Sequence, residues 1–393
     1  MLPIQLVEAD HIKCAHPFNG LFLEANADLK TCCAGQCSLG NANTDNISDV
    51  YNGGIAREIR EAMLKNEWHP NCYLCKEIEE LGGKSTRNTE FFRTDPSTLT
   101  ADTYRMEVID LRWNNTCNLM CTYCMPKFSN KWAKALGSEI TKVTNDKENQ
   151  LFDFLEEHKE SLTRAMLLGG EPTLHLQNIK LMENYPHLHY TMLSNLAISN
   201  IENNPVVKKM LEIEHFNWGV SFENVGEKFE YVRFGANWDT FVHNIKYVQE
   251  KVRENGNVLT AHPLFCLFSA YDLVDFYDFV TENNLFNGGI SWQLLLHNGG
   301  AICNMTKKFK EKAIIEIDRC ITKYPDAMGI NMLLDFKNQL ISDLENPDDM
   351  NYMREVVQYI DRVDKHLSNR LHNFKDLWHD EWKLLMEGAN YES

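Results

Sequence analysis

The sequence predicts an α/β fold: a partial (β/α)6 TIM-like barrel preceded by a small cysteine-rich domain and followed by a helical C-terminal tail. Three observations support this prediction. Strand-like and helical segments alternate between residues 104 and 300, cysteines gather near the start, and the end of the chain shows charged patterns of helical period. Alternation of this kind is typical of parallel strands joined by crossover helices. At 393 residues the chain is long enough for a barrel and a smaller domain.

Six short apolar runs are predicted as the barrel strands. They are residues 106–112, 165–168, 189–193, 215–222, 258–268 and 290–296. Helical patterns lie between them, the clearest at residues 148–162, 205–213, 238–255 and 270–284. In barrels of this type the chemistry lies in the loops at the C-terminal ends of the strands, so we expect functional residues there.

The flanking regions differ from the barrel in composition. Residues 1–95 are rich in Cys, Gly and Asn, with predicted helices at 55–66 and 75–81, and residues 85–103 resemble a linker. A domain with so small a core is typically held together by a metal. Residues 301–393 form the predicted helical extension, with helices at 307–323, 350–365 and 371–386 and no recognisable chemical motif.

Charge and hydropathy narrow the classes of function. The formal charge is −17, and a negative field repels a phosphate backbone, so nucleic acid is not the expected partner. No apolar run is long enough to cross a membrane. The first residues lack the basic and apolar regions of a secretory signal, so we expect a cytoplasmic protein. In that reducing compartment, clustered cysteines are more often metal ligands than disulfides.

The strongest motif follows the first predicted strand and contains Cys117, Cys121 and Cys124. Thiolates spaced by four and three residues can each bind one iron of a cubane cluster and leave the fourth iron open. The alternative is a structural zinc site, but zinc normally takes four ligands and this loop offers three.

This loop resembles that of the radical S-adenosylmethionine (SAM) superfamily, in which an aromatic residue, here Tyr123, precedes the last cysteine. Gly169-Gly170-Glu171 follows the second predicted strand and resembles the family motif that contacts the amino group of SAM. Glycines allow close approach of the backbone, and a carboxylate suits an ammonium group. The resemblance implies that the three cysteines hold a [4Fe–4S] cluster whose open iron binds SAM.

The same resemblance suggests further contacts to SAM at the ends of later strands. Ser194 and Asn195 end the third strand, and Ser221 and Glu223 end the fourth. Relatives use these positions to touch the SAM carboxylate and ribose, although many have Asp where this chain has Glu223. Arg233 lies in a segment that resembles the one whose arginine binds the SAM carboxylate, a group that a guanidinium can bind through two hydrogen bonds.

A second group of cysteines resembles the SPASM/twitch family of auxiliary-cluster domains. Its four expected ligands are Cys14, Cys32, Cys72 and Cys75. The resemblance implies a second, fully ligated [4Fe–4S] cluster, with structural zinc as the alternative. Two departures are that the domain precedes the barrel and that the family's hairpin glycine is Ala27 here. Cys33 and Cys37 are alternatives to Cys32 as the second ligand.

The resemblance therefore implies an enzyme, a radical SAM oxidoreductase or maturase. It would cleave SAM reductively to a 5′-deoxyadenosyl radical and abstract hydrogen from a substrate. A peptide or protein is the expected substrate, and a sugar, nucleoside or antibiotic is the alternative. A third possibility is a non-catalytic iron–sulfur or zinc protein. An electron donor such as flavodoxin or ferredoxin is implied. His262 and His297 are weaker candidates for contact with substrate, and Trp292 and Gln293 could lie either in the core or in the pocket.

Overall fold

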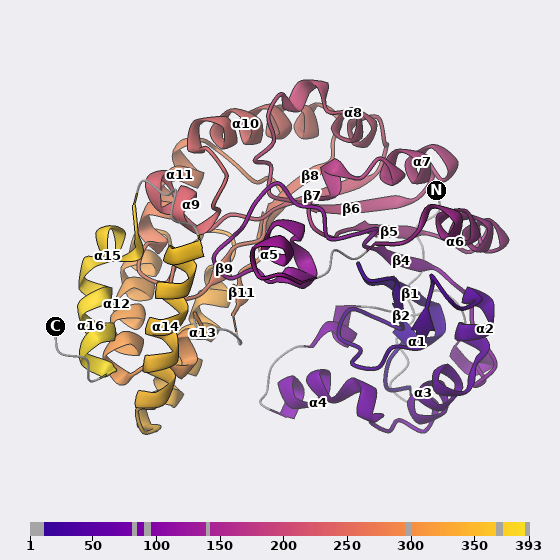
Figure 1. The fold of residues 1–393 in the computed structure, drawn as a ribbon, viewed down its shortest axis with the longest axis horizontal. Helices are drawn as coiled ribbons and strands as arrows, with labels where there is room; N and C mark the ends of the chain where they lie inside the picture. Colours follow the sequence, from indigo (N-terminus) through magenta and orange to yellow (C-terminus); the bar gives the residue numbers. More distant parts are fainter. Residues whose placement is uncertain are drawn as a thin grey trace. The chain divides into compact units, whose positions relative to one another are not determined.

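The computed structural model describes residues 12–80, 85–89, 96–138, 142–295, 300–366 and 372–389 (Figure 1). The chain forms two compact units. The first contains Met1–Thr116 and Glu139–Met192, and the second contains Cys117–Ser138 and Leu193–Ser393. Within the described ranges, no helix is long and apolar enough to span a membrane.

The first unit is built on a mostly parallel sheet with the strand order β6-β5-β4-β1-β2-β3. Strand β1 pairs in parallel with β4, the first predicted barrel strand, with Leu23 opposite Leu111 (Figure 1). Strands β2 and β3 then return in antiparallel pairs. The cysteine-rich segment thus shares a sheet with the first barrel strand, which the sequence did not indicate. The strands are β1 (Gly20–Leu23), β2 (Asp28–Lys30), β3 (Gly40–Asn41), β4 (Val108–Leu111), β5 (Arg164–Leu167) and β6 (His189–Ser194).

Helices of the first unit pack near these strands. They are α1 (His16–Asn19), α2 (Ile47–Asn52), α3 (Gly54–Leu64), α4 (Tyr73–Glu80), α6 (Asn145–Glu157) and α7 (Gln177–Asn184). Short 3₁₀ turns are Pro70–Cys72, Thr86–Thr89, Pro96–Thr98 and Pro172–Leu174. The helices predicted at 55–66 and 148–162 are present as α3 and α6, which both begin and end earlier than predicted. The last predicted residue of the 75–81 helix lies outside the described residues.

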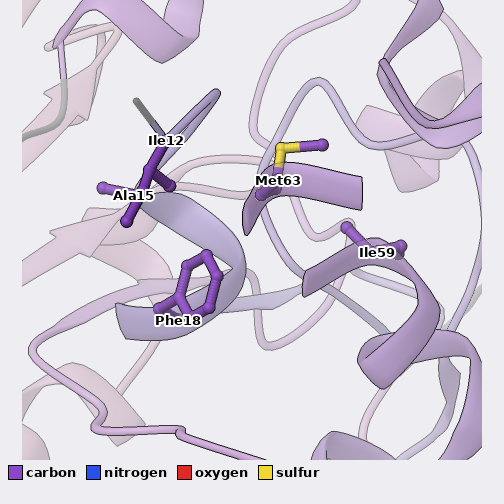
Figure 2. Close-up of a cluster of buried hydrophobic side chains, with 5 residues drawn as sticks. All are labelled: Ile12, Ala15, Phe18, Ile59 and Met63. Atoms are coloured by element: carbon purple, nitrogen blue, oxygen red, sulfur yellow. The ribbon is translucent and has the colours of Figure 1, made fainter. Parts of the chain in front are cut away.

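A small hydrophobic core lies between α1 and α3 (Figure 2). Cys14 and Cys72 pack against this core, although neither is fully buried. Two of the predicted metal ligands are therefore placed by apolar packing. The core consists of Ile12, Ala15, Phe18, Ile59 and Met63.

In the second unit, the parallel strands β7 (Phe216–Val220), β8 (Val258–Ala261) and β10 (Gly289–Ile290) are ordered β10-β8-β7. A separate parallel pair consists of β9 (Leu264–Phe265) and β11 (Gln293–Leu294). The sequence predicted single strands at 258–268 and 290–296, and both predictions were wrong in this respect. Pro263 has no N–H for the ladder, so the strand breaks there. His297 and the end of the last predicted strand lie outside the described residues.

Helices make up the rest of the second unit. They are α5 (Asn130–Ala135), α8 (Pro205–Leu211), α9 (Gly226–Val232), α10 (Trp238–Glu254), α11 (Leu273–Glu282), α12 (Lys307–Lys323), α13 (Ile330–Ser342), α14 (Met350–His366), α15 (Phe374–Leu377) and α16 (His379–Gly388). The extension after residue 301 is helical, as predicted, but the sequence missed α13. The predicted fold class, α/β with mostly parallel strands and a helical C-terminal region, is confirmed.

Candidate functional sites

The loop 117–124 in the second unit is fixed by backbone hydrogen bonds to the segment after α9. The Met120 amide donates to the Phe234 carbonyl at 2.9 Å, and the Thr122 amide donates to the Val232 carbonyl at 2.8 Å. These bonds flank the position of Arg233. The loop with the three predicted cluster ligands and the predicted SAM-binding arginine are therefore parts of one local structure.

Side chains at the start of α5 support the same loop. The Cys117 amide donates to Asn130 Oδ1 at 3.0 Å, and Trp132 Nε1 donates to the Cys121 carbonyl at 3.0 Å. Ser129 caps α5 by accepting from the Trp132 amide. These supporting residues were not predicted from the sequence. A serine directly before a short helical pattern was the one signal that could have pointed to them.

Tyr123, Glu223 and Arg233 form a buried polar group beside the loop. The Tyr123 hydroxyl donates to Glu223 Oε1 at 2.8 Å, and Arg233 Nη2 lies 2.8 Å from Glu223 Oε2. Arg233 Nη1 also lies 3.9 Å from Cys121 Sγ. Ser221, near this group in sequence, donates its backbone amide to the Ser194 carbonyl at 3.0 Å. Three of the predicted SAM contacts are thus brought together with a predicted cluster ligand.

Arg233 is suited to bind an anion. Burial alone lowers the pKa of its guanidinium, but the adjacent charges, Glu223 first, raise it overall, so the group stays cationic. Its Nε is buried and makes no hydrogen bond to any residue that the structure describes. A buried N–H without an acceptor is costly, and a carboxylate would satisfy it. The arrangement therefore fits the carboxylate of SAM.

The thiols of the loop are held in a low-dielectric setting. Burial raises the pKa of Cys121, and the positive charge of Arg233 opposes that shift. Burial, with the neighbouring Cys121, raises the pKa of Cys124 to about 12. Cysteine binds iron as the thiolate, and burial disfavours this negatively charged form. Nearby positive charge is therefore needed to stabilise the thiolates. Cluster irons supply that charge, and the donor set therefore fits a cluster.

The end of β6 contributes another predicted contact to the loop. Asn195 Nδ2 donates to Asn118 Oδ1 at 2.9 Å and lies 3.9 Å from Cys117 Sγ. The Ser194 hydroxyl accepts from the Leu196 amide at 3.0 Å. Leu196 has φ of 50°, a left-handed conformation that is strained for a bulky residue. Backbone strain thus accompanies the turn that directs Asn195 at the first cysteine.

In the first unit, Gly169-Gly170-Glu171 packs against Thr116, the residue directly before the loop. Gly169 has φ of 118°, and a Cβ on Gly170 would lie 2.1 Å from the Thr116 carbonyl oxygen, so neither position accepts a side chain. The Glu171 amide donates to that carbonyl at 2.8 Å. Its carboxylate accepts from the Thr173 hydroxyl at 2.6 Å. Glu171 therefore also caps a turn, a role that the sequence did not predict.

The four predicted auxiliary ligands, also in the first unit, line one small cavity. The cavity is bordered by Cys14, Cys32, Cys72 and Cys75, with Asn71, Trp68 and Arg87. Cys33 and Cys37 do not border it, which supports Cys32 as the second ligand. Among the described residues, no group of three or more His, Cys, Asp or Glu side chains could hold a single metal ion. Ligands of a cubane bind different irons and need not meet at one point.

Electrostatics link these four cysteines. Burial raises the pKa of Cys14 well above its usual range, and Cys32 adds to the shift. Burial also raises the pKa of Cys32 and of Cys72 to about 11 each. Arg87, on the cavity wall, donates to Glu79 at 2.6 Å and to the Lys13 carbonyl at 3.0 Å. Mutual repulsion among thiolates is relieved by metal binding, and the donor set therefore fits an auxiliary cluster.

The C-terminal helix α14 contacts the same site in the second unit. The Tyr359 hydroxyl donates to the Thr122 carbonyl in the cysteine loop. Asp364 accepts from the Tyr231 hydroxyl at 2.8 Å, two residues before Arg233. The predicted tail without a chemical motif therefore supports both the loop and the arginine segment. Nothing in the sequence of α14 indicated this.

The weaker sequence candidates have ordinary surroundings. His262 follows β8 and is half-buried, and burial lowers its pKa. Trp292 is buried and donates to the Tyr277 hydroxyl at 3.1 Å, so it belongs to the core. Gln293 is exposed on β11.

Comparisons with known proteins agree with this chemistry. Residues 111–280 match the radical SAM superfamily, and residues 14–76 match an iron–sulfur cluster-binding domain, SPASM. Residues 111–280 are therefore a radical SAM domain, which belongs to the SAM-dependent iron–sulfur class. More specifically, a SPASM domain at residues 14–76 precedes the radical SAM domain, and the cofactors of these two domains are SAM, a [4Fe–4S] cluster and an auxiliary iron–sulfur cluster. The predicted family and cofactors are confirmed, which favours iron–sulfur over zinc.

Several solved structures are similar to parts of the chain. AdoMet-bound anSMEcpe is 16% identical, with a TM-score of 0.40 over 59% of this chain and 60% of that one. Streptococcus suis SuiB bound to S-adenosylmethionine is 14% identical, with a TM-score of 0.40 over 70% of this chain and 60% of that one. TYW1 with a lysine–pyruvate adduct is 12% identical, with a TM-score of 0.32 over 55% of this chain and 71% of that one. The chain thus spans about 60% of the first of these relatives. No curated protein matches the sequence.

Proposed function

We propose that this protein is a radical SAM enzyme that modifies a peptide or protein, a maturase-type reaction. The observation that carries the proposal is the pairing of a radical SAM domain with a SPASM domain in one chain. The cluster ligands are Cys117, Cys121 and Cys124. The SAM-binding residues are Tyr123, Gly169, Gly170, Glu171, Ser194, Asn195, Ser221, Glu223 and Arg233.

The residues of the second unit have distinct tasks in this proposal. Arg233 binds the SAM carboxylate through the Nε that has no acceptor among the described residues, and Glu223 holds the guanidinium in place through Nη2. Tyr123 fixes the second oxygen of Glu223. Burial of this group excludes water, which strengthens each polar contact. When bound and reduced, the cluster and SAM supply a 5′-deoxyadenosyl radical that can abstract hydrogen from an unactivated carbon.

The glycine motif of the first unit acts through its backbone packing and through the carboxylate of Glu171. Because Gly169 and Gly170 carry no side chains, the turn packs directly against the backbone at Asn114 and Thr116, and this packing fixes the position of Glu171. The Glu171 carboxylate suits the SAM ammonium. Its bond to Thr173 keeps the carboxylate in one orientation before SAM arrives.

The auxiliary site is proposed to hold its cluster with four protein ligands, Cys14, Cys32, Cys72 and Cys75. A fully ligated cluster has no open iron, which suits an electron acceptor better than a site of substrate coordination. Held by these four cysteines, the cluster would supply a one-electron acceptor for the substrate radical. Arg87, on the cavity wall, offsets part of the negative charge of the thiolates.

The substrate assignment is supported by the kind of domain and by charge. Enzymes that join SPASM-type domains to radical SAM barrels often modify peptides or proteins. The charge of −17 favours a neutral or basic substrate over nucleic acid. We therefore propose a neutral or basic peptide segment.

Label transfer tests this proposal. The reduced enzyme and SAM are incubated with perdeuterated peptides of varied charge, and separately with deuterated sugars and nucleosides. We expect deuterium in 5′-deoxyadenosine, and a changed peptide mass, with peptides only. A variant with Cys117, Cys121 and Cys124 replaced by Ala is the control and should transfer no label. Transfer from a sugar or nucleoside, with no responding peptide, would overturn the substrate assignment.

A further inference from the structure

The segment that contains the cysteine loop and α5 has an unusual charge. Residues 117–138 contain three lysines and no Asp or Glu, in a chain whose net charge is −17. Lys127, Lys131 and Lys134 are all exposed. The exposed apolar side chains Met125 and Leu136, at 38% and 45% exposure, lie in the same segment. These five exposed residues, Lys127, Lys131, Lys134, Met125 and Leu136, are called the lysine patch.

The lysine patch borders a cavity that reaches one of the cluster ligands. The cavity has a volume of about 530 Å³ and is lined by Cys124, Met125 and Leu136 on the side of the loop. Helix α14 forms the other wall, where Glu355 and Arg362 provide one charge of each sign. Cys124 is only half-buried. The third cysteine is therefore approachable from the outer surface.

Reduction of the cluster requires an electron from outside the chain. An electron carrier must come close to the cluster, dock briefly and leave. Such complexes have small interfaces, and opposite charges on the two partners speed their formation. Exposed apolar residues among charges of one sign are suited to this kind of contact.

We propose that the lysine patch is the docking surface for a small acidic electron-carrier protein, which delivers its electron past Cys124. The proposal rests on the proposed function, because it assumes that the cluster lies at Cys117, Cys121 and Cys124. The carrier gives up one electron and is oxidised, and the cluster takes up that electron and is reduced. An acidic partner fits because the patch is positive while the rest of the chain would repel it.

The test compares two reductants in one holoenzyme. The variant Lys127→Glu/Lys134→Glu reverses two charges of the patch. Lys131 is left intact because its Nζ donates to the Asn118 carbonyl in the cysteine loop. The control variant Lys375→Glu/Lys383→Glu makes the same charge change on α15 and α16, at two exposed lysines.

With reduced flavodoxin as the donor at low salt, the patch variant should cleave SAM at least about tenfold more slowly than the parent. With dithionite, which needs no docking surface, its rate should be unchanged. Added salt should slow the flavodoxin-driven reaction of the parent and of the control variant, and should have little effect on the patch variant.

Several outcomes would overturn the proposal. One is an unchanged flavodoxin-driven rate in the patch variant, and another is an equal loss in the control variant. If the rate of dithionite-driven cleavage also falls in the patch variant, the dissociation constant of its complex with flavodoxin is measured by titration. A dissociation constant equal to that of the parent overturns the proposal. A parent enzyme that cleaves no SAM with dithionite would instead refute the proposed function.

Discussion

The two cysteine sites are built in different ways. The loop 117–124 takes its three cysteines from one short segment, whose backbone is bonded to the residues around Arg233. The auxiliary site takes four cysteines from segments spread between Cys14 and Cys75, around a core of five buried side chains. The first site is fixed by hydrogen bonds that need no metal. In the second, Cys14 and Cys72 are placed by packing against that small apolar core.

This difference indicates what each cluster contributes. A loop whose shape is set by protein hydrogen bonds is prepared for its cofactor, so the cofactor adds reactivity more than stability. A domain with a small core gains much of its folding free energy from metal binding. We therefore expect the first cluster to add little to the stability of its unit, and the auxiliary cluster to stabilise its unit in addition to accepting an electron.

The largest effect that would test this difference comes from removing each cluster in turn. Replacing Cys117, Cys121 and Cys124 by Ala should abolish SAM cleavage and remove about half of about eight irons. Thermal unfolding should shift little. Replacing Cys72 and Cys75 by Ala should remove the other half and lower the Tm by about 2–4 °C for each kcal/mol lost.

Iron analysis, anaerobic SAM-cleavage assays and thermal melts measure both outcomes. Cys303→Ala and Cys320→Ala, at cysteines outside both sites, are the controls for loss of a thiol. An auxiliary variant that melts at the temperature of the parent would contradict the structural role of the second cluster.

A smaller effect is expected at Arg233. Arg233→Lys keeps the positive charge but loses the planar guanidinium, so SAM should bind about 10–100-fold more weakly, with the iron content unchanged. Arg233→Ala is less informative, because it leaves Glu223 buried and unpaired at a cost of about 3–5 kcal/mol. Anaerobic calorimetry with SAM gives the dissociation constant. A lysine variant that binds SAM as tightly as the parent would show that Arg233 does not bind the carboxylate.

The smallest predicted effect concerns the hairpin beside the auxiliary site. Ala27 has φ of 68°, which is strained for any residue with a Cβ. Ala27→Gly should therefore raise the free energy of unfolding by up to about 1 kcal/mol. Ala25, buried in the same turn but without positive φ, provides the control, and Ala25→Gly should destabilise. Denaturant titration measures both, and equal destabilisation would exclude strain at Ala27.

The sequence predicted most of the candidate site because its signals are local. The spacing of Cys117, Cys121 and Cys124 and the glycine motif both lie within short segments after predicted strands. Ala27 was also informative, because it marked a position where the family has glycine and the structure has positive φ. Family membership and cofactors followed from these residues.

The rest depends on contacts between distant segments, which single-sequence patterns do not encode. The pairing of β1 with β4 joins residues that are far apart in the sequence, so no local pattern indicates it. Strand β1 itself is a short apolar run without the alternation of polar and apolar residues that predicts a strand. The break at Pro263 could have been recognised, since proline rarely lies within a central strand. The bond from Tyr359 to the loop joins residues far apart in sequence and has no local signal.

The parallel pairing of β1 with β4 has a consequence for biosynthesis. Gly20 lies opposite Val108, so β1 leaves the ribosome well before its partner strand is made. Until then the nascent N-terminal segment has its cysteines in place but an unpaired strand edge, which is prone to aggregation. Long-range parallel pairing also forms slowly. We therefore expect the domain that contains the auxiliary site to fold only after β4 has left the ribosome, although this domain is synthesised first.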